Sequence, residues 1–240
     1  MDIAIALAVV IASVFIIFRL NTLATKIKIR VSNDGYIDGH AKYQALLLLL
    51  ASSVLLLAYL QNSENFTTLF SLGDLSARVG AVLWFGISEN RTWVFAGLYL
   101  SVIITLGTLT FVFFQFRSLK VNIREVFPYM HWVIIFSLAN SFSEEAIFRL
   151  GIIVPLIGEV DPDYLILLSA IVFGLAHFGG MPHGLIGMLM AGFLGWFLAK
   201  SVVETQGIFW AWMIHFIQDI VIYIGFMVGQ ISRKYARENG

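Results

Sequence analysis

The stretch SLANSFSEEAIFRLGIIVPLIG, residues 137–158, is apolar along most of its length and yet contains Glu144, Glu145 and Arg149. Two further apolar stretches carry ionisable residues in the same way: YLILLSAIVFGLAHF (164–178) contains His177, and GIFWAWMIHFIQDIVIYIGF (207–226) contains His215 and Asp219. An ionisable group at bilayer depth costs several kcal/mol and persists mainly where a site uses it. The three stretches therefore predict a polar site built inside a bundle of membrane helices.

The composition supports a membrane protein. Of 240 residues, 59% are hydrophobic and 12% are charged, and the mean hydropathy is +0.87. These values are typical of an all-α, polytopic bundle of transmembrane helices. The absence of cysteine excludes disulfides, thiol nucleophiles and thiolate metal sites. A formal net charge of zero gives no electrostatic reason for a nucleic-acid partner, and we expect none.

Seven stretches are long and apolar enough, or nearly enough, to span a bilayer. They are residues 3–19, 44–60, 94–115, 129–157, 164–179, 184–199 and 207–229. The short apolar piece Val79–Ile87 is expected to lie at the membrane interface or to re-enter the membrane. An eighth span would exist only if this piece crossed the membrane. Small residues recur along the sixth stretch, which predicts close helix packing there; they are Gly184, Gly187, Ala191 and Gly195.

The loop charges predict an orientation with the N-terminus outside and the C-terminus in the cytoplasm. In this orientation most basic residues are cytoplasmic: Arg19, Lys26, Lys28, Arg30, Lys42, Arg117, Lys120, Arg124, Arg233, Lys234 and Arg237. We expect a multi-pass membrane protein, in the plasma membrane if the source is prokaryotic. The spans before residue 128 are expected to hold no buried acid or base, so we divide one membrane domain into N-terminal scaffold helices (1–128) and a C-terminal catalytic bundle (129–240).

The acidic pair in the fourth stretch has two interpretations. Glu145 and Arg149 are four residues apart and can pair on one helix face. Glu144 is rotated by about 100° from Glu145 and cannot share that partner equally. The cluster is either a structural ion pair that holds the bundle together or the acid of a reactive site.

The two buried histidines favour a reactive site. A Glu–His pair can abstract a proton from water while a second histidine donates to a developing oxyanion. Asp219 follows His215 by four residues and can orient its ring. Alternatively, Glu144, His177 and His215 would hold Zn²⁺ with an open position for water, although no H-E-x-x-H motif occurs. The remaining histidines receive no chemical role: His40 in a polar loop, His131 at the start of the fourth span and His183 in an interfacial turn.

These motifs resemble those of the CAAX prenyl protease and bacteriocin-processing (CPBP, Abi) family of intramembrane endopeptidases. Glu144-Glu145-x-x-x-Arg149 is similar to its E-E-x-x-x-R motif, Phe173-x-x-x-His177 to F-x-x-x-H, and His215-x-x-x-Asp219 to H-x-x-x-N/D. The resemblance covers about residues 129–225. It implies that Glu144 and His177 activate water, that His215 and residue 219 stabilise the oxyanion, and that Glu145 and Arg149 support them.

One departure concerns the last motif position, because the prenyl-protein endopeptidases of this family have Asn where this chain has Asp219. An ionised Asp would repel an oxyanion, so Asp219 is either protonated or serves by orienting His215. The resemblance implies an enzyme, a glutamate or metallo endopeptidase, that cleaves near the C-terminus of a protein or peptide, prenylated or not, beside membrane lipid. The implied activity does not strictly require a cofactor. The alternatives are a noncatalytic membrane scaffold and, less favoured, a proton-coupled transporter.

Overall fold

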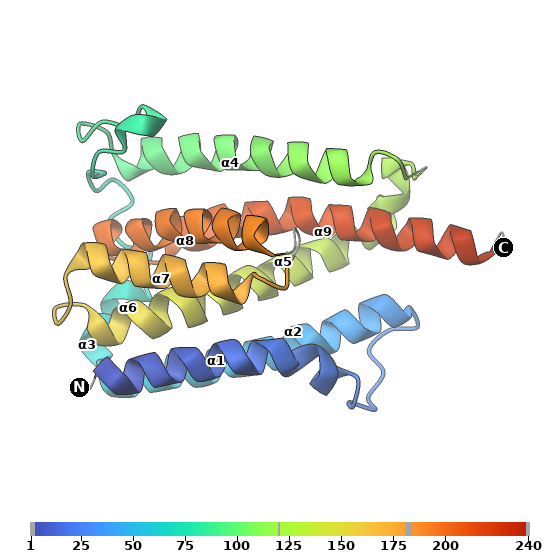
Figure 1. The fold of residues 1–240 in the computed structure, drawn as a ribbon, viewed down its shortest axis with the longest axis horizontal. Coiled ribbons are helices and arrows are strands. Elements are labelled where there is room, and N and C mark those ends of the chain that lie inside the picture. The colour runs from blue at the N-terminus through green and yellow to red at the C-terminus, as the bar shows by residue number, and fades with distance from the viewer. Residues whose placement is uncertain (1–2, 120, 181–183, 239–240) are drawn as a thin grey trace.

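The helices of the computed structural model lie side by side along the longest axis of the molecule (Figure 1). The structure describes residues 3–119, 121–180 and 184–238. The predicted position of His183 lies outside these ranges. The main helices are α1 (Ile3–Ala24), α2 (Gly35–Gln61), α4 (Trp93–Phe116), α5 (Met130–Glu145), α7 (Pro162–Ala176), α8 (Leu185–Thr205) and α9 (Phe209–Glu238). The shorter ones are α3 (Ser63–Leu69), α6 (Gly151–Leu156) and the 3-10 turns Leu83–Phe85 and Ile123–Tyr129.

Within the described ranges, five helices are long and apolar enough to cross a membrane: α1, α2, α4, α8 and α9. The other two predicted spans, residues 129–157 and 164–179, are not long uninterrupted α-helices. The stretch 129–157 is helical, but a π-helical segment at Ala146–Leu150 separates α5 from α6. The helix α7 has only 15 residues, shorter than the ~20 that a span normally needs. An all-helical membrane fold is therefore observed, and the number of seven spans stays a prediction.

Local sequence fixes several helix ends. Asp34 caps α2, because its carboxylate accepts hydrogen bonds from the backbone N–H groups of Tyr36 and Ile37, which have no partner within the helix. Asp161 caps α7 in the same way, and Pro162 occupies the first turn. The helix α8 ends at Gln206, which has a left-handed backbone with φ of 52°. These ends set the length of the helices that carry the site.

Helices α7 and α8 pack closely through their glycines, as the small residues predicted. A Cβ atom added at Gly174 would lie 2.7 Å from the carbonyl oxygen of Met188, and one at Gly195 would lie 2.9 Å from Cδ1 of Phe173. The contact is centred on Gly174, Gly192 and Gly195, whereas Gly184 precedes the helix with φ of 74°. This approach presses the Phe173 side of α7 against the bundle.

The segment Val79–Ile87 folds as a small cap on one end of the bundle. Val79, Val82 and Ile87 are buried against Trp93 and Phe197, whereas Leu83 and Trp84 are 75% and 73% exposed. Exposed apolar side chains at the end of a helical bundle are typical of the membrane interface. Trp210 packs in the same cluster and is 5% exposed.

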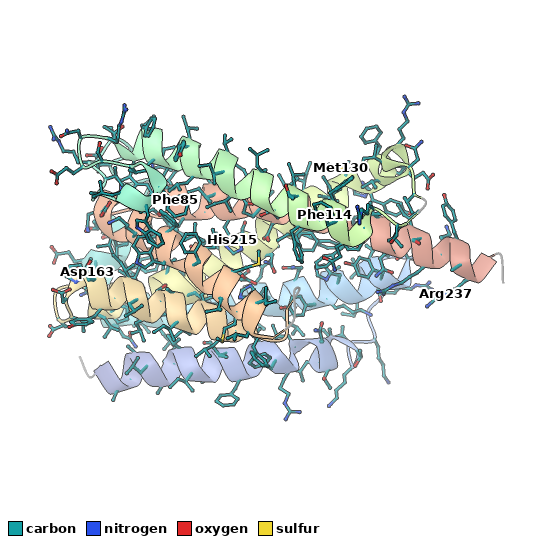
Figure 2. All side chains as sticks on the ribbon, turned by 45° about the horizontal axis from the view of Figure 1, so that its top comes forward. Phe85, Phe114, Met130, Asp163, His215 and Arg237 are labelled. Carbon is teal, nitrogen blue, oxygen red and sulfur yellow. The ribbon has the colours of Figure 1, made fainter. Side chains whose placement is uncertain are left out.

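Buried polar groups gather in the middle of the bundle, far from its ends. Figure 2 shows His215 near the centre of the helices, with Asp163 near one end and Arg237 near the other. His215 and Asp219 are each 4% exposed, and Glu145 and Arg149 are fully buried. The packing of α5, α7 and α9 thus brings the three ionisable stretches together.

Candidate active site

The acidic pair lies where the fourth helical stretch changes its winding. Glu144 and Glu145 are the last residues of α5, and the π-helical segment Ala146–Leu150 follows directly. Such segments inside helices are rare and occur often at functional sites. Glu145 faces the core, and Glu144 faces a cavity that α7 and α9 also line.

Glu145 and Arg149 form the pair that their spacing predicts. Arg149 Nε lies 3.0 Å from Glu145 Oε2, with both side chains almost completely buried. The guanidinium of Arg149 also lies over the ring of Phe173, 4.2 Å from its centroid. Its terminal nitrogens Nη1 and Nη2 find no hydrogen-bond partner within the described ranges, so the aromatic face is their main neighbour.

Glu145 also orients His215. Its Oε1 lies 2.7 Å from His215 Nδ1, which fixes the ring with Nε2 turned toward the cavity. Asp219 Oδ1 lies 3.7 Å from His215 Nε2, too far for a hydrogen bond. The residue that holds the ring in place is therefore Glu145, while Asp219 stands beside the free nitrogen.

The carboxylate of Glu144 lies between the two histidines. Its Oε2 is 3.6 Å from His177 Nε2 and 3.6 Å from His215 Nε2. His177 Nδ1 lies 2.8 Å from the carbonyl oxygen of Phe173, and an N–H there leaves the lone pair of the neutral ring on Nε2. Glu144 Oε2 itself has no hydrogen-bond partner among the described residues. One carboxylate oxygen and two imidazole nitrogens thus face the same small space.

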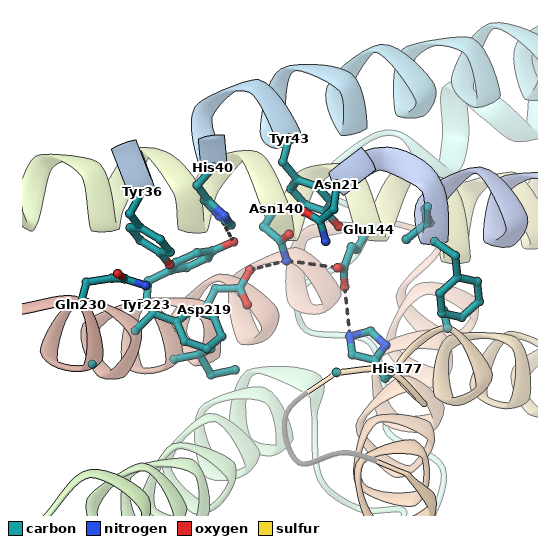
Figure 3. Close-up of a pocket in the computed structure, with 18 of the residues that line it drawn as sticks. Asn21, Tyr36, His40, Tyr43, Asn140, Glu144, His177, Asp219, Tyr223 and Gln230 are labelled. Carbon is teal, nitrogen blue, oxygen red and sulfur yellow. Dashed lines mark hydrogen bonds and ion pairs between the residues drawn. The ribbon is translucent and has the colours of Figure 1, made fainter. Parts of the chain in front are cut away.

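Two cavities meet at this point. The larger has a volume of about 670 Å³ and extends from Glu144 and His177 past Tyr36 and Gln230 to Arg233, as Figure 3 shows for the labelled residues. The smaller has a volume of about 180 Å³ and lies between α4, α8 and α9. Its walls are mostly apolar, with Ile104, Phe111, Val112, Met190 and Leu194 among them. Asn140, Glu144, His177 and Asp219 line both cavities.

Comparison with known proteins identifies the part of the chain that carries this site. Residues 126–221 match the family described as type II CAAX prenyl endopeptidase Rce1-like. This segment is similar to the Rce1-like endopeptidases. It contains all six candidate site residues, and it confirms the resemblance that the three motifs indicated. No curated protein and no solved structure matches the chain. This similarity implies a protease with a protein substrate, in an integral membrane protein.

The predicted metal site in this segment finds no direct support in the arrangement of the side chains. Within residues 3–119, 121–180 and 184–238, no group of three or more His, Asp or Glu residues is arranged to hold a metal ion. Both histidines do fix their Nδ1 atoms on protein oxygens, which is the support that ligating imidazoles usually have. Zn²⁺ held by Glu144, His177 and His215 therefore remains a hypothesis for experiment.

Three features of the site were not predicted from the sequence. Phe173 contacts Arg149, His177 and His215 with its ring, the last two at centroid distances of 4.4 and 5.7 Å. Asn140 Nδ2 donates to Glu144 Oε1 and Asp219 Oδ2. No spacing rule marks either residue, although Phe173 is the first letter of the F-x-x-x-H motif, and that letter could have drawn attention to it.

The third unpredicted feature is a polar group on α2. His40 was placed in a polar loop, and this is wrong because α2 begins at Gly35. His40 Nε2 lies 2.9 Å from the hydroxyl of Tyr223, and Gln44 Nε2 donates to the same hydroxyl at 2.7 Å. These side chains line the larger cavity beside the site or support it (Figure 3). The first half of the chain therefore contributes to the cavity wall, while the division at residue 128 stays a prediction.

Proposed function

We propose that the protein is an intramembrane endopeptidase that hydrolyses a peptide bond near the C-terminus of a protein or peptide substrate. The observation that carries this proposal is the position of Glu144 Oε2, 3.6 Å from the Nε2 atoms of both His177 and His215. A carboxylate with a free oxygen beside two imidazoles, at the wall of a cavity, is suited to general acid–base catalysis.

In the proposed reaction, Glu144 and His177 hold a water molecule, and Glu144 takes its proton. The water oxygen bonds to the carbonyl carbon of the scissile peptide, and the carbonyl oxygen becomes an oxyanion. His215 Nε2–H donates to that oxyanion while Glu145 holds the opposite nitrogen. The C–N bond then breaks as Glu144 returns the proton to the leaving amine. Water is consumed, no acyl-enzyme forms, and Arg149 supports Glu145.

The larger cavity would hold the substrate tail. The part of α9 from Asp219 to Arg233 rises about 21 Å at ~1.5 Å per residue, which is the length of about six residues of extended chain. In the orientation predicted from the loop charges, with the N-terminus outside, this cavity opens to the cytoplasm. The smaller apolar cavity would take the hydrocarbon chain of a prenylated substrate, since apolar groups favour such walls.

The experiment is cleavage of lipidated and unlipidated tail peptides by the purified full chain in detergent. We expect Glu144→Ala and His177→Ala to lower kcat by about 10²- to 10⁴-fold, the usual contribution of a positioned acid or base. Glu159→Ala and His131→Ala are matched controls, because both residues are exposed and neither lines the two cavities. Undiminished cleavage by Glu144→Ala would refute the proposal, and no cleavage of any peptide by folded protein would favour the noncatalytic scaffold.

Two further arms address the finer chemistry. We expect cleavage to persist in a strong chelator, since Glu144 and His177 can activate water directly; loss of cleavage, restored by Zn²⁺, would instead assign Glu144, His177 and His215 as metal ligands. We expect Asp219→Asn to retain activity, because an amide can donate to an oxyanion. Complete loss in folded protein would show that the carboxylate itself is needed.

A further inference from the structure

Asn140 joins the two carboxylates that line the site. It lies on α5, one turn before Glu144, with the side chain half-buried at the junction of the two cavities. Its Nδ2 donates to Glu144 Oε1 at 3.2 Å and to Asp219 Oδ2 at 3.1 Å. Its Oδ1 accepts a hydrogen bond from Gln44 Nε2 on α2 at 3.3 Å. One neutral amide thus connects α2, α5 and α9, and Figure 3 shows its bonds to Glu144 and Asp219.

The chemistry of the amide suits this position. A side-chain NH₂ has two N–H donors, and two carboxylates that approach each other repel unless something lies between them. The Asn140 amide supplies one donor to each acid without adding a charge. A carboxylate at this position would offer no donor when ionised and would bring a third negative charge.

The hydrogen bond from Asn140 also decides which oxygen of Glu144 is free. It holds Oε1, so that Oε2 is the oxygen that faces His177 and His215. Because Gln44 fixes the far side of the amide, Asn140 itself has little freedom to rotate. The orientation of the proposed base is therefore set from α2, outside the residues that match the protease family.

We propose that Asn140 is a positioning residue that bridges Glu144 and Asp219 and directs Glu144 Oε2 at the two histidines. This inference rests on the proposed function, since it concerns the same reaction. Exchanging the amide and the acid restores a donor and an acceptor between positions 140 and 219, but an ionised carboxylate at position 140 still gives Glu144 Oε1 no donor.

The test compares the full chain carrying Asn140→Asp, Asp219→Asn and both changes together. Asn90→Asp is the matched control, because Asn90 is exposed in a loop. For Asn140→Asp we expect kcat to fall at least about tenfold at neutral pH with KM little changed, since the base is misdirected while the cavity remains. Activity should return as the pH falls, because the introduced carboxyl group regains a donor once it is protonated. The double variant should keep the low kcat at neutral pH, because the carboxylate at position 140 offers Glu144 Oε1 no donor.

The activity of Asn140→Asp at low pH also depends on the titratable groups around position 140. The titratable ones that face it, from α2, α5, α7 and α9, are His40, Tyr43, Glu144, His177, His215, Asp219 and Tyr223. The control Asn90→Asp and the wild type have the same surroundings but keep the amide at position 140. The difference between their profiles and that of Asn140→Asp therefore isolates the new carboxyl group.

Melting temperatures measured across the same pH range separate this inference from the proposed function. If the wild type cleaves no peptide, or Glu144→Ala cleaves as well as the wild type, the proposed function fails, and the melting temperatures still test the bridge. If Asn140 bridges the two acids, Asn140→Asp should have a lower melting temperature than the wild type at neutral pH, and this difference should become smaller as the pH falls. The double variant should have a higher melting temperature than Asn140→Asp. Wild-type kcat, pH profile and melting in Asn140→Asp would overturn the inference, as would wild-type kcat at neutral pH in the double variant.

Discussion

Replacing Arg149 with Met should destabilise the protein strongly, because it leaves a buried carboxylate without its cation. The side chains of Arg149 and Glu145 are 0% and 1% exposed, with Nε and Oε2 3.0 Å apart. Breaking such a pair by removing one partner costs about 3–5 kcal/mol. Met fills similar space over the Phe173 ring, so most of the loss should come from Glu145 and not from packing.

The pair variant Glu145→Gln with Arg149→Met separates charge from packing. Without either charge, the cost should be small, and replacing a buried pair by neutral groups is often neutral or stabilising. Each single variant leaves one partner uncompensated, so the coupling between the two positions should be about 3 kcal/mol or more. Glu145→Gln should also lower kcat, because His215 Nδ1 loses its charged partner.

Reversible unfolding of the purified protein in mixed micelles would give these free energies, with Arg124→Met as the control at an exposed arginine. Equal unfolding free energies for Arg149→Met and the wild type would refute the argument. So would additive effects in the double variant, because additivity means that the two residues do not interact in the folded protein.

Three further changes test the packing around the site and at the end of the bundle. Gly195→Ala places a Cβ 2.9 Å from Cδ1 of Phe173; we expect a loss of about 1–3 kcal/mol in unfolding free energy and, in the peptide assay, a lower kcat from displacement of the ring. Phe173→Leu removes the ring under Arg149 and should lower the unfolding free energy by about 2 kcal/mol; an effect within the ~0.5 kcal/mol that surface changes usually give would contradict the role of the ring. Glu204→Gln removes the charge that accepts from Trp93 Nε1 at 2.8 Å and from Gly80 N at 3.0 Å; we expect a loss of about 1–3 kcal/mol, against no change for Glu159→Gln.

The sequence predicted those parts of the site that depend on helix periodicity. Glu145 and Arg149 pair because four residues make about one helical turn, and Glu144 points elsewhere because it is one residue away. The close approach at Gly195 follows from the same regularity. A periodic pattern needs only the local helix to be correct, and the family match adds the expectation of a common site.

The parts that could not be predicted depend on how different helices meet. Nothing in the spacing of α9 indicates that Glu145, and not Asp219, holds the Nδ1 atom of His215. Trp210 Nε1 donates to the carbonyl oxygen of Leu75 in a segment far away in sequence, and no local pattern indicates this contact. His40 could not be placed while the start of α2 was unknown.

The site needs the whole bundle because its geometry depends on contacts between helices and not on the spacing within one helix. The acids come from α5, one histidine from the end of α7 and the other from α9, so no single helix sets the distance between base and oxyanion donor. Phe173 connects these elements: its ring touches Arg149, His177 and His215, and its carbonyl oxygen holds His177 Nδ1. Asn140 makes the equivalent connection on the cavity side, between Glu144, Asp219 and Gln44. A fixed arrangement of this kind lets polar groups act at bilayer depth without the cost of reorganising them during the reaction.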